Sequence, residues 1–148
     1  GPRQDPHGEA GVVAIFCNRL LDGRALTVFG DGEQTRDYVY AGDVAGANFA
    51  AATVDLPPPG RLDARAFNIG TSIETSVNTL AETLRSVSSA HSPIDYAPAR
   101  AGELARSALA TTKAQAVLGW MPKVTLREGL EHTFRSFADR RARAERRT

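Results

Sequence analysis

Leu26-Thr-Val-Phe-Gly-Asp-Gly-Glu-Gln-Thr-Arg-Asp-Tyr-Val-Tyr40 is the stretch that decides the fold, because an apolar run gives way to a glycine-rich turn and then returns. The pattern predicts short strands at Leu26 to Phe29 and at Asp37 to Tyr40, joined as a hairpin or by a wider excursion. Asp43 then has the position of an N-cap for an alanine-rich helix that runs to about Val54. Strand and helix signals in such close succession favour an α/β fold.

Further strand and helix signals lie on both sides of this stretch. Apolar residues at helical spacing predict a helix from Gly11 to Leu21, and Gly23 follows as a stop signal. Brief apolar runs predict strands at Ala66 to Ile69 and at Ile94 to Ala97. Pro57-Pro-Pro-Gly60 predicts the loop that ends the alanine-rich helix, because proline cannot continue a helix.

Capping residues predict the remaining helices. Ser76 precedes one helix, and Thr112 precedes a shorter one that Gly119 ends. Thr125 and Glu128 have the spacing of a capping box at the start of the last helix. The apolar faces predicted for the first and last of these helices consist of Leu80, Leu84, Leu126, Leu130, Phe134 and Phe137.

Composition limits the size and the partners of the fold. The chain has 148 residues, of which 42% are hydrophobic and 24% charged, enough for one compact domain with its own core. A net charge of +1 and a pI of about 8.2 predict no nucleic-acid partner. The basic end at residues 140–148 is expected to be a solvated, frayed tail. The one cysteine, Cys17, is expected to be a small core residue.

The two ends of the chain give few signals of targeting. No apolar run is long enough to cross a bilayer and no signal peptide is apparent, so we expect a cytoplasmic location and no membrane partner. Gly1-Pro-Arg3 lacks a methionine and has the character of a loop. We therefore expect residues 1–148 to form a single compact unit that is truncated before residue 1.

The sequence lacks the common catalytic and cofactor motifs. Leu109 and Gly119 stand four positions before the two lysines, Lys113 and Lys123, so no Tyr-x-x-x-Lys pair exists. Gly30-Asp-Gly32 has no third glycine and leads into a predicted strand, whereas a dinucleotide-binding loop leads into a helix. The chain therefore carries no Rossmann cofactor loop.

The three histidines predict neither a metal site nor a catalytic triad. His7, His91 and His132 are widely separated, without partner cysteines and without a His-Glu-x-x-His pattern. A Gly-x-Ser-x-Gly motif is also absent. We expect these residues to be ordinary surface histidines and expect no bound metal.

Two arginines in glycine-bounded turns give the strongest binding signal. Arg36 follows the turn at Gly32, and the second arginine begins Arg100-Ala-Gly-Glu103. Glycine lets the backbone approach a ligand, and the planar guanidinium grips phosphate oxygens in pairs. The simpler alternatives are an ion pair of Arg36 with Asp37, a pair of Glu103 with Arg100 or Arg106, and a plain core position for Phe29.

Several motifs occur in an order that resembles a known protein family. They are Gly1-Pro-Arg-Gln-Asp-Pro6, Val28 to Tyr40, Asp43-Val44, Phe67-Asn-Ile-Gly70, Glu74-Thr-Ser76, Arg100-Ala-Gly-Glu103 and Lys113 to Lys123. Together they resemble the C-terminal half of the NAD-dependent epimerase/dehydratase family, the extended short-chain dehydrogenases that act on nucleotide sugars. The fold that this implies is a substrate-binding portion with a remnant strand and helix of the Rossmann sheet. Residues 1–16 resemble the bacterial UDP-glucose 4-epimerases in particular.

The resemblance implies a binding site for a UDP-sugar. It places Arg36 and Arg100 on the diphosphate and Glu103 on the ribose hydroxyls. Thr27 to Phe29 correspond to the strand that lines the uracil pocket, with the Phe29 ring against the base.

Three further positions complete the implied site. Gly11 and Val12 match residues whose backbone amides approach the phosphates at a helix N-terminus, where such amides favour anions. Gln34 matches a polar neighbour of the sugar or phosphate. The implied substrate-binding residues are Gly11, Val12, Thr27, Phe29, Gln34, Arg36, Arg100 and Glu103.

The reaction that the resemblance implies depends on residues outside this chain. In the family, bound NAD oxidises the sugar at C4, and a tyrosine beside a lysine acts as the base. Those residues correspond to positions before Gly1, so we expect no catalytic or cofactor-binding residue here. Weak nucleotide affinity and no turnover are expected of the chain alone. The usual family dimer interface is also expected to be missing, and the predicted strand at 67–69 would lack its sheet neighbours, which favours association or partial disorder.

Three functions therefore stay open. The first is the nucleotide-sugar-binding half of an NAD-dependent 4-epimerase. The second is the matching half of a related dehydratase or decarboxylase, because both arginine motifs recognise the nucleotide diphosphate and not the reaction. The third is a non-catalytic binding or interaction module that keeps the fold.

Overall fold

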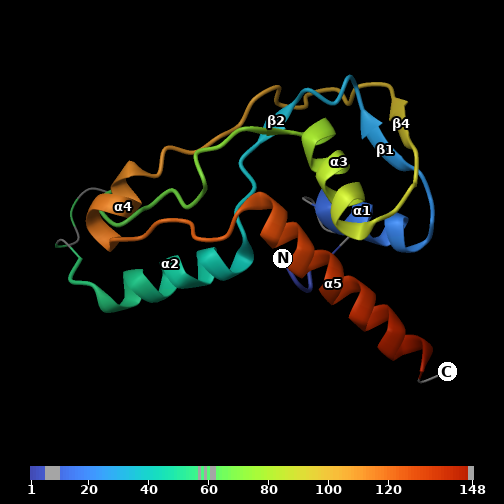
Figure 1. Cartoon of the computed structure of the whole chain (residues 1–148). Helices are drawn as coiled ribbons and strands as arrows, with labels where there is room; N and C mark the ends of the chain where they lie inside the picture. The colour runs from blue at the N-terminus through green and yellow to red at the C-terminus, as the bar shows by residue number, and fades with distance from the viewer. Residues whose placement is uncertain (6–10, 57, 59, 61–62, 147–148) are drawn as a thin grey trace.

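The described part of the chain folds into nine regular elements that form two lobes (Figure 1). A computed structural model describes residues 1–5, 11–56, 58, 60 and 63–146. The elements are α1 (Val12–Leu21), β1 (Leu26–Phe29), β2 (Thr35–Arg36), α2 (Ala41–Thr53), β3 (Thr75–Ser76), α3 (Val77–Ser88), β4 (Ile94–Ala97), α4 (Thr112–Leu118) and α5 (Leu126–Glu145). In Figure 1, α2 and α4 lie on the left, β1 and β4 lie at the upper right with α3 and α1 beside them, and α5 runs from the centre to the lower right. The predicted α/β class is confirmed at this level.

The larger lobe is built on a parallel pair of strands. β1 and β4 pair in the register Leu26↔Ile94 to Phe29↔Ala97, and α3 and α1 pack against β1. Alternate residues of β1, Leu26 and Val28, are fully buried in the core. Buried apolar side chains from α1, α3 and α5 complete this core, as expected for amphipathic helices. The strands predicted at Leu26 to Phe29 and at Ile94 to Ala97 are confirmed, and so is the helix predicted at Gly11 to Leu21.

The glycine-rich turn leads to a wide excursion and not to a hairpin. β2 pairs with β3 in an antiparallel bridge, Thr35↔Ser76 and Arg36↔Thr75, so β1 and β2 are not partners. The predicted strand at Asp37 to Tyr40 is wrong, because regular pairing ends at Arg36. There the Asp37 carboxylate, and not a neighbouring strand, accepts the backbone N–H groups of Thr71 and Ser72 at 2.7 and 2.9 Å.

The smaller lobe has its own apolar core around Trp120. Ala47 of α2 and Ala114 and Leu118 of α4 pack with the indole, and side chains such as Phe67 cover them. This core shares no residue with the core of the larger lobe. Since the two lobes are joined mainly by connecting segments, the contacts in those segments determine how the lobes are held together.

The predicted N-cap role of Asp43 is wrong. Tyr40 occupies the N-cap of α2, and Asp43 lies within the first turn with only 7% of its surface exposed. Its carboxylate accepts the backbone N–H groups of Lys123 and Val124 at 3.0 and 2.9 Å, while its own carbonyl accepts the Trp120 indole N–H at 2.9 Å. Asp43 therefore joins α2 to the chain after α4.

The predicted strand at Ala66 to Ile69 is also wrong. These residues have no regular structure, because within the described ranges no strand pairs with them. Phe67 and Ile69 pack instead against the core of the smaller lobe. The predicted loop at Pro57-Pro-Pro-Gly60 lies partly outside the described residues, at Pro57 and Pro59, and α2 itself ends at Thr53.

Besides Asp43, three helix N-caps were predicted, and two of them are confirmed. The Ser76 side chain accepts the Thr79 N–H at the start of α3, and Thr125 and Glu128 form a reciprocal capping box at α5. The third prediction is off by one residue, because Thr111 and not Thr112 is the N-cap of α4 and its side chain makes no capping bond. Gly119 ends α4 with a φ of 63°, a conformation that favours glycine.

The helix α5 extends into the basic end of the chain as far as Glu145. In this region Arg141 forms ion pairs with Asp22 and with Glu145, which lies one turn away on the same helix. The last predicted tail residues, 147 and 148, lie outside the described part of the chain.

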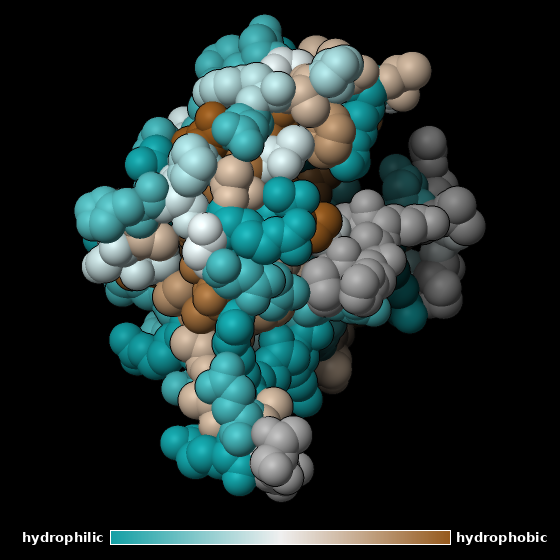
Figure 2. All heavy atoms as spheres, turned by 90° about the vertical axis from the view of Figure 1, so that its right-hand side faces the viewer, coloured by the Kyte–Doolittle hydropathy of each residue, from teal (hydrophilic) through white to brown (hydrophobic). Residues whose placement is uncertain are grey.

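Figure 2 shows the face at the right of Figure 1, where hydrophilic groups predominate and apolar ones appear in patches between them.

Cys17 of α1 is fully buried in the core of the larger lobe, as predicted. Burial raises the pKa of its thiol to about 12, with opposing effects of the N-terminal charge and a backbone hydrogen bond. Among the helices that the structure describes, none combines the length and the apolar character needed to cross a membrane.

Candidate functional site

A cleft of about 760 Å³ lies in the larger lobe beside α1 and the end of β1. All eight residues predicted to bind substrate line it: Gly11, Val12, Thr27, Phe29, Gln34, Arg36, Arg100 and Glu103. Sequence reasoning did not assign the other lining residues, which are Gln4, Val13, Ile15, Phe16, Arg19, Asp37, Tyr38 and Val77. The predicted residues come from segments far apart in the chain, and the fold brings them together. Their roles toward a ligand stay a prediction.

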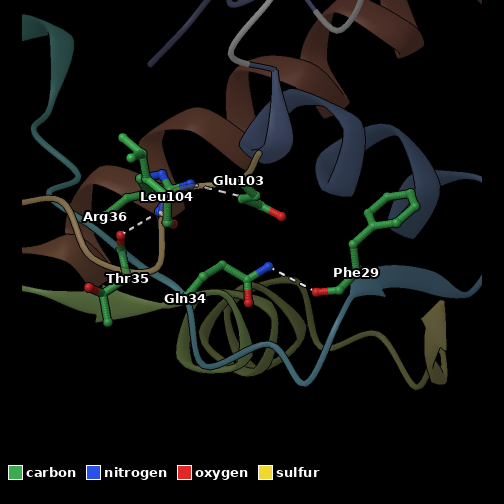
Figure 3. A network of polar contacts seen from close by, with 6 residues as sticks. All are labelled: Phe29, Gln34, Thr35, Arg36, Glu103 and Leu104. Carbon is green, nitrogen blue, oxygen red and sulfur yellow. Dashed lines mark hydrogen bonds and ion pairs between the residues drawn. The ribbon is translucent and has the colours of Figure 1, made fainter. Parts of the chain in front are cut away.

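Arg36 is held in place by backbone carbonyls on two segments. Its Nη1 donates to the carbonyls of Thr35 and Leu104, each at 2.7 Å (Figure 3). Its Nη2 lies 3.5 Å from Glu103, and both side chains are 30% exposed. Carbonyl contacts fix the plane of the guanidinium, whereas a long, half-exposed ion pair contributes less than about 1 kcal/mol. Arg36 is thus oriented chiefly by hydrogen bonds to the backbone.

The alternative ion pairs are not those that the structure forms. Arg36 pairs with Glu103, while Asp37 accepts hydrogen bonds from the backbone of residues 71, 72 and 109. Arg106 pairs with Glu74 through two bonds, at 2.7 and 2.9 Å. Glu103 thus pairs with Arg36, and both residues line the cleft.

Arg100 stacks on Phe29 at the end of β1. The guanidinium carbon lies 3.9 Å from the ring centroid, which is a close cation–π contact. Phe29 is half-buried and lines the cleft, so it is not a plain core residue. The turn that carries Arg100 needs Gly102 at a φ of 77°, where a side chain would be strained.

Gln34 fastens the glycine-rich turn to β1. Its Nε2 donates to the Phe29 carbonyl at 2.9 Å, and Figure 3 shows this amide reaching across the turn. The turn itself requires positive φ at Gly30 and Gly32, of 70° and 76°. Gln34 is therefore a structural tie as well as a lining residue of the cleft.

The start of α1 forms another wall of the cleft. Gly11 is the N-cap of α1 and has no side chain to cap the helix, so the first amides depend on other groups. Gln4 supplies one of these, because its Oε1 accepts the Ala14 N–H at 3.1 Å. Sequence reasoning missed Gln4, whose distance along the chain from α1 gives no local signal.

Tyr38 is the most informative residue that sequence reasoning missed. It lines the cleft, and its hydroxyl is buried without a hydrogen-bond partner among the described atoms. Burial raises the pKa of the phenol, with the nearby charge of Arg36 opposing this rise and that of Glu103 adding to it. A buried hydroxyl without a partner is costly, which suits a position that meets a polar ligand. The Arg-Asp-Tyr sequence itself was the available signal.

Asp37 joins the floor of the cleft to the segments leading to the smaller lobe. Its carboxylate accepts hydrogen bonds from the Thr71 amide and hydroxyl, from Ser72 and from Leu109. Burial alone would raise its pKa, but these hydrogen bonds outweigh that effect and hold the pKa below its ordinary range. Gly70 approaches so closely that a Cβ there would lie 2.5 Å from an Asp37 carboxylate oxygen.

A second polar cluster, formed by Glu74, Arg106 and Thr35, lies outside the set of residues that line the cleft. Glu74 accepts hydrogen bonds from Arg106 and from the Thr35 hydroxyl at 2.6 Å. The hydrogen bonds of Arg106, and then that of Thr35, lower the pKa of Glu74 to about 2. Thr35 also donates its backbone N–H to Ala105 at 2.9 Å, so the segment that carries Arg100 and Glu103 is tied to β2 and to β3.

The glycine turn after β1 does not fit a dinucleotide cofactor. Gly30 and Gly32 turn the chain toward β2, whereas a cofactor loop ends at a helix N-terminus that faces the pyrophosphate. Within the described ranges, no group of three His, Cys, Asp or Glu side chains gathers as a metal site would require. The chemistry that this cleft offers is therefore anion and polar-group recognition.

Comparison with protein families gives one extensive match. A family model described as GDP-mannose 4,6 dehydratase matches residues 1–133. A curated relative, the UDP-glucose 4-epimerase of Mycolicibacterium smegmatis, is 46% identical over 140 residues. The alignment covers 95% of this chain and 43% of that enzyme, so the chain spans less than half the length of the relative it matches.

Solved structures give the same picture. The UDP-glucose 4-epimerase of Thermotoga maritima, crystallised with UDP-glucose, superposes with a TM-score of 0.85 at 46% identity and covers 95% of this chain and 43% of its own. The UDP-glucose 4-epimerase of Thermus thermophilus, in complex with NAD, superposes with a TM-score of 0.80 at 39% identity, covering 93% and 43%.

Proposed function

The chain belongs to the NAD-dependent epimerase/dehydratase family of nucleotide-sugar enzymes, and we propose that it is the nucleotide-sugar-binding, C-terminal half of a UDP-glucose 4-epimerase-like enzyme. The identity of 46% to an epimerase over nearly the whole chain supports this choice. The 43% of the relative that is covered supports the idea of a half. In this proposal the complete enzyme is a cytoplasmic isomerase of carbohydrate metabolism.

One observation carries the proposal: Arg36 and Arg100, 64 positions apart in numbering, line a single cleft. Two guanidinium groups in one cleft suit a diphosphate, because each planar fork can donate two hydrogen bonds to phosphate oxygens. Arg19 also lines the cleft, but its Nη1 donates to the Ala25 carbonyl at 2.9 Å. The cleft also offers Phe29, an aromatic surface on which a nucleobase can stack.

The remaining residues divide the nucleotide between them. Glu103 accepts hydrogen bonds from the ribose hydroxyls, and Thr27 lies on β1 beside the base. The amides at Gly11 and Val12 face the phosphates, where the positive end of the α1 dipole favours anions. Gln34 is a polar neighbour of the sugar or phosphate. This assignment fills the cleft from base to sugar.

The chain's contribution to catalysis is binding and orientation. NAD supplies hydride chemistry to enzymes of this family, but the glycine turn here does not fit it, and we assign no catalytic residue to this chain. Contacts to the remote UDP group hold the sugar in a productive geometry, and binding energy of that kind raises the rate of a reaction elsewhere on the substrate.

Calorimetric titration of the full chain with UDP, dTDP and GDP tests the proposal. We expect UDP to bind more tightly than GDP. The Kd for UDP should be about millimolar, because UDP is only part of the nucleotide-sugar substrate. The ribose contact is tested by comparing the affinities for UDP and for 2′-deoxy-UDP. We expect UDP to bind more tightly, and Glu103→Ala should abolish this difference. Absence of binding by all three nucleotides would contradict the proposal and favour a non-catalytic interaction module.

A second candidate is the corresponding half of a nucleotide-sugar dehydratase or decarboxylase. The match of residues 1–133 to a dehydratase family model favours it. The two arginines would hold the same diphosphate in either enzyme. Tighter binding of GDP than of UDP would support a GDP-sugar dehydratase over the epimerase.

A further inference from the structure

Arg100 covers one face of the ring on which a nucleobase would stack. Its guanidinium carbon is 3.9 Å from the Phe29 centroid, and both residues line the cleft. Stacked aromatic rings lie at comparable separations, with centroids about 4.5–7 Å apart. The guanidinium therefore fills the volume that a base on the same face would need.

Phe29 is the fixed partner in this contact. It ends β1, where it pairs with Ala97 of β4, and the next amide, of Gly30, donates to the Ala97 carbonyl at 2.8 Å. Its own carbonyl accepts the Gln34 amide. Arg100 by contrast is exposed and lies beyond the end of β4. A ligand that stacks on this face of the ring therefore has to displace the Arg100 side chain.

The two possible partners of Arg100 differ in strength. A cation–π contact at an exposed site favours the stacked position by about two- to fivefold. A charge-assisted hydrogen bond to a phosphate favours the displaced position by about ten- to hundredfold. A ligand with phosphates next to its base therefore compensates for uncovering the ring, whereas a base without phosphates does not.

We propose that Arg100 makes recognition of the base and recognition of the diphosphate interdependent, because its side chain either stacks on Phe29 or binds the phosphates of the ligand. This inference rests on the proposed function. It makes Arg100 a specificity-determining residue, because nucleosides must compete with its side chain while nucleoside diphosphates recruit it.

The test compares uridine with UDP on the full chain by NMR titration. Arg100→Ala should lower the affinity for UDP about tenfold or more and raise the affinity for uridine about two- to fivefold. Arg127→Ala is the matched control, because Arg127 is an exposed arginine that pairs with Glu131 on α5 and does not line the cleft. It should change neither affinity.

A double-mutant cycle with Phe29→Leu separates stacking from other effects. If the gain for uridine comes from uncovering the ring, Arg100→Ala should produce no gain in the Phe29→Leu background. Circular dichroism checks that the variants are folded, and the Arg100→Ala comparison carries the test if Phe29→Leu does not fold.

The outcomes distinguish this inference from the proposed function. Wild-type binding of UDP together with an unchanged or lower uridine affinity in Arg100→Ala overturns the interdependence and leaves the proposed function intact. Failure of the wild-type chain to bind UDP overturns both.

Discussion

Arg36 donates a hydrogen bond of 2.7 Å to the carbonyl of Leu104, so one predicted phosphate-binding arginine is held by the segment that carries the other. Thr35 reinforces this link through its bond to the Ala105 carbonyl. Displacement of either segment would change the spacing of both guanidinium groups. The distance between Arg36 and Arg100 therefore depends on the contacts that β2 makes with residues 104 and 105, and not only on the two side chains.

Replacing Arg36 should weaken nucleotide binding. Arg36→Ala is expected to cost about 1.5–3 kcal/mol of UDP affinity through the lost charge-assisted bonds, and Arg36→Lys should restore only part because an ammonium lacks the planar fork. Calorimetry with Arg127→Ala as control measures the effect. Unchanged affinity in both Arg36→Ala and Arg100→Ala would rule out a diphosphate clamp.

Tyr38→Phe should separate binding from stability. The buried hydroxyl has no protein partner among the described atoms, so its removal should not lower the free energy of unfolding. If a ligand supplies the missing partner, UDP affinity should fall by about 0.5–1.5 kcal/mol. Urea unfolding and calorimetry on the same variant measure the two quantities. A loss of stability without a loss of affinity would show that the hydroxyl serves the fold.

Asp43→Ala should destabilise the smaller lobe. It leaves the N–H groups of Lys123 and Val124 without their acceptor, and each unpaired, partly buried donor costs about 1–3 kcal/mol. Urea unfolding followed by fluorescence of Trp120, the only tryptophan, reports on this lobe. Asp139→Ala, an exposed substitution on α5, is the control, and an equal effect in both variants would contradict the role of Asp43.

Acid should destabilise the fold partly through Asp37. The folded-state pKa of Asp37 lies below the ordinary value of 3.8, so the unfolded chain binds more protons in that range. The contribution of Asp37 is complete above the ordinary value and is lost as the pH falls through the folded-state pKa. Unfolding free energy measured below pH 5 should therefore fall less steeply in Asp37→Asn than in the wild type or in the exposed control Asp95→Asn.

Local signals predicted most of the elements of the larger lobe. Helical spacing gave α1, the capping box gave α5, and the apolar runs at Leu26 to Phe29 and at Ile94 to Ala97 gave the paired strands. In each of these, the residues that specify the element are close together in sequence. The same holds for Ser76 at the start of α3.

Errors arose where contacts between distant residues decide the structure. Apolar residues at 37–40 and 66–69 have strand-like composition, but a strand forms only when another strand supplies its hydrogen bonds. Asp43 has a side chain that commonly caps helices, but its carboxylate accepts hydrogen bonds from the backbone of Lys123 and Val124 instead. These competing partners are not visible in a local pattern.

The candidate site was predictable only as a set of residues. Arg36 and Arg100 stand in recognisable motifs, and the fold places both in one cleft. The cover that Arg100 forms over Phe29, and the lone hydroxyl of Tyr38, depend on side-chain geometry that motif spacing does not encode.

The separation of the two apolar cores has a consequence for the way the molecule opens. Because the core around Trp120 shares no residue with the core that supports the cleft, each can lose its packing while the other keeps its own. Amide hydrogens in α2 and α4 should therefore exchange with solvent as one cooperative group, and those in α1, α3 and β1 as another. The cleft would then keep its structure during fluctuations that open the smaller lobe.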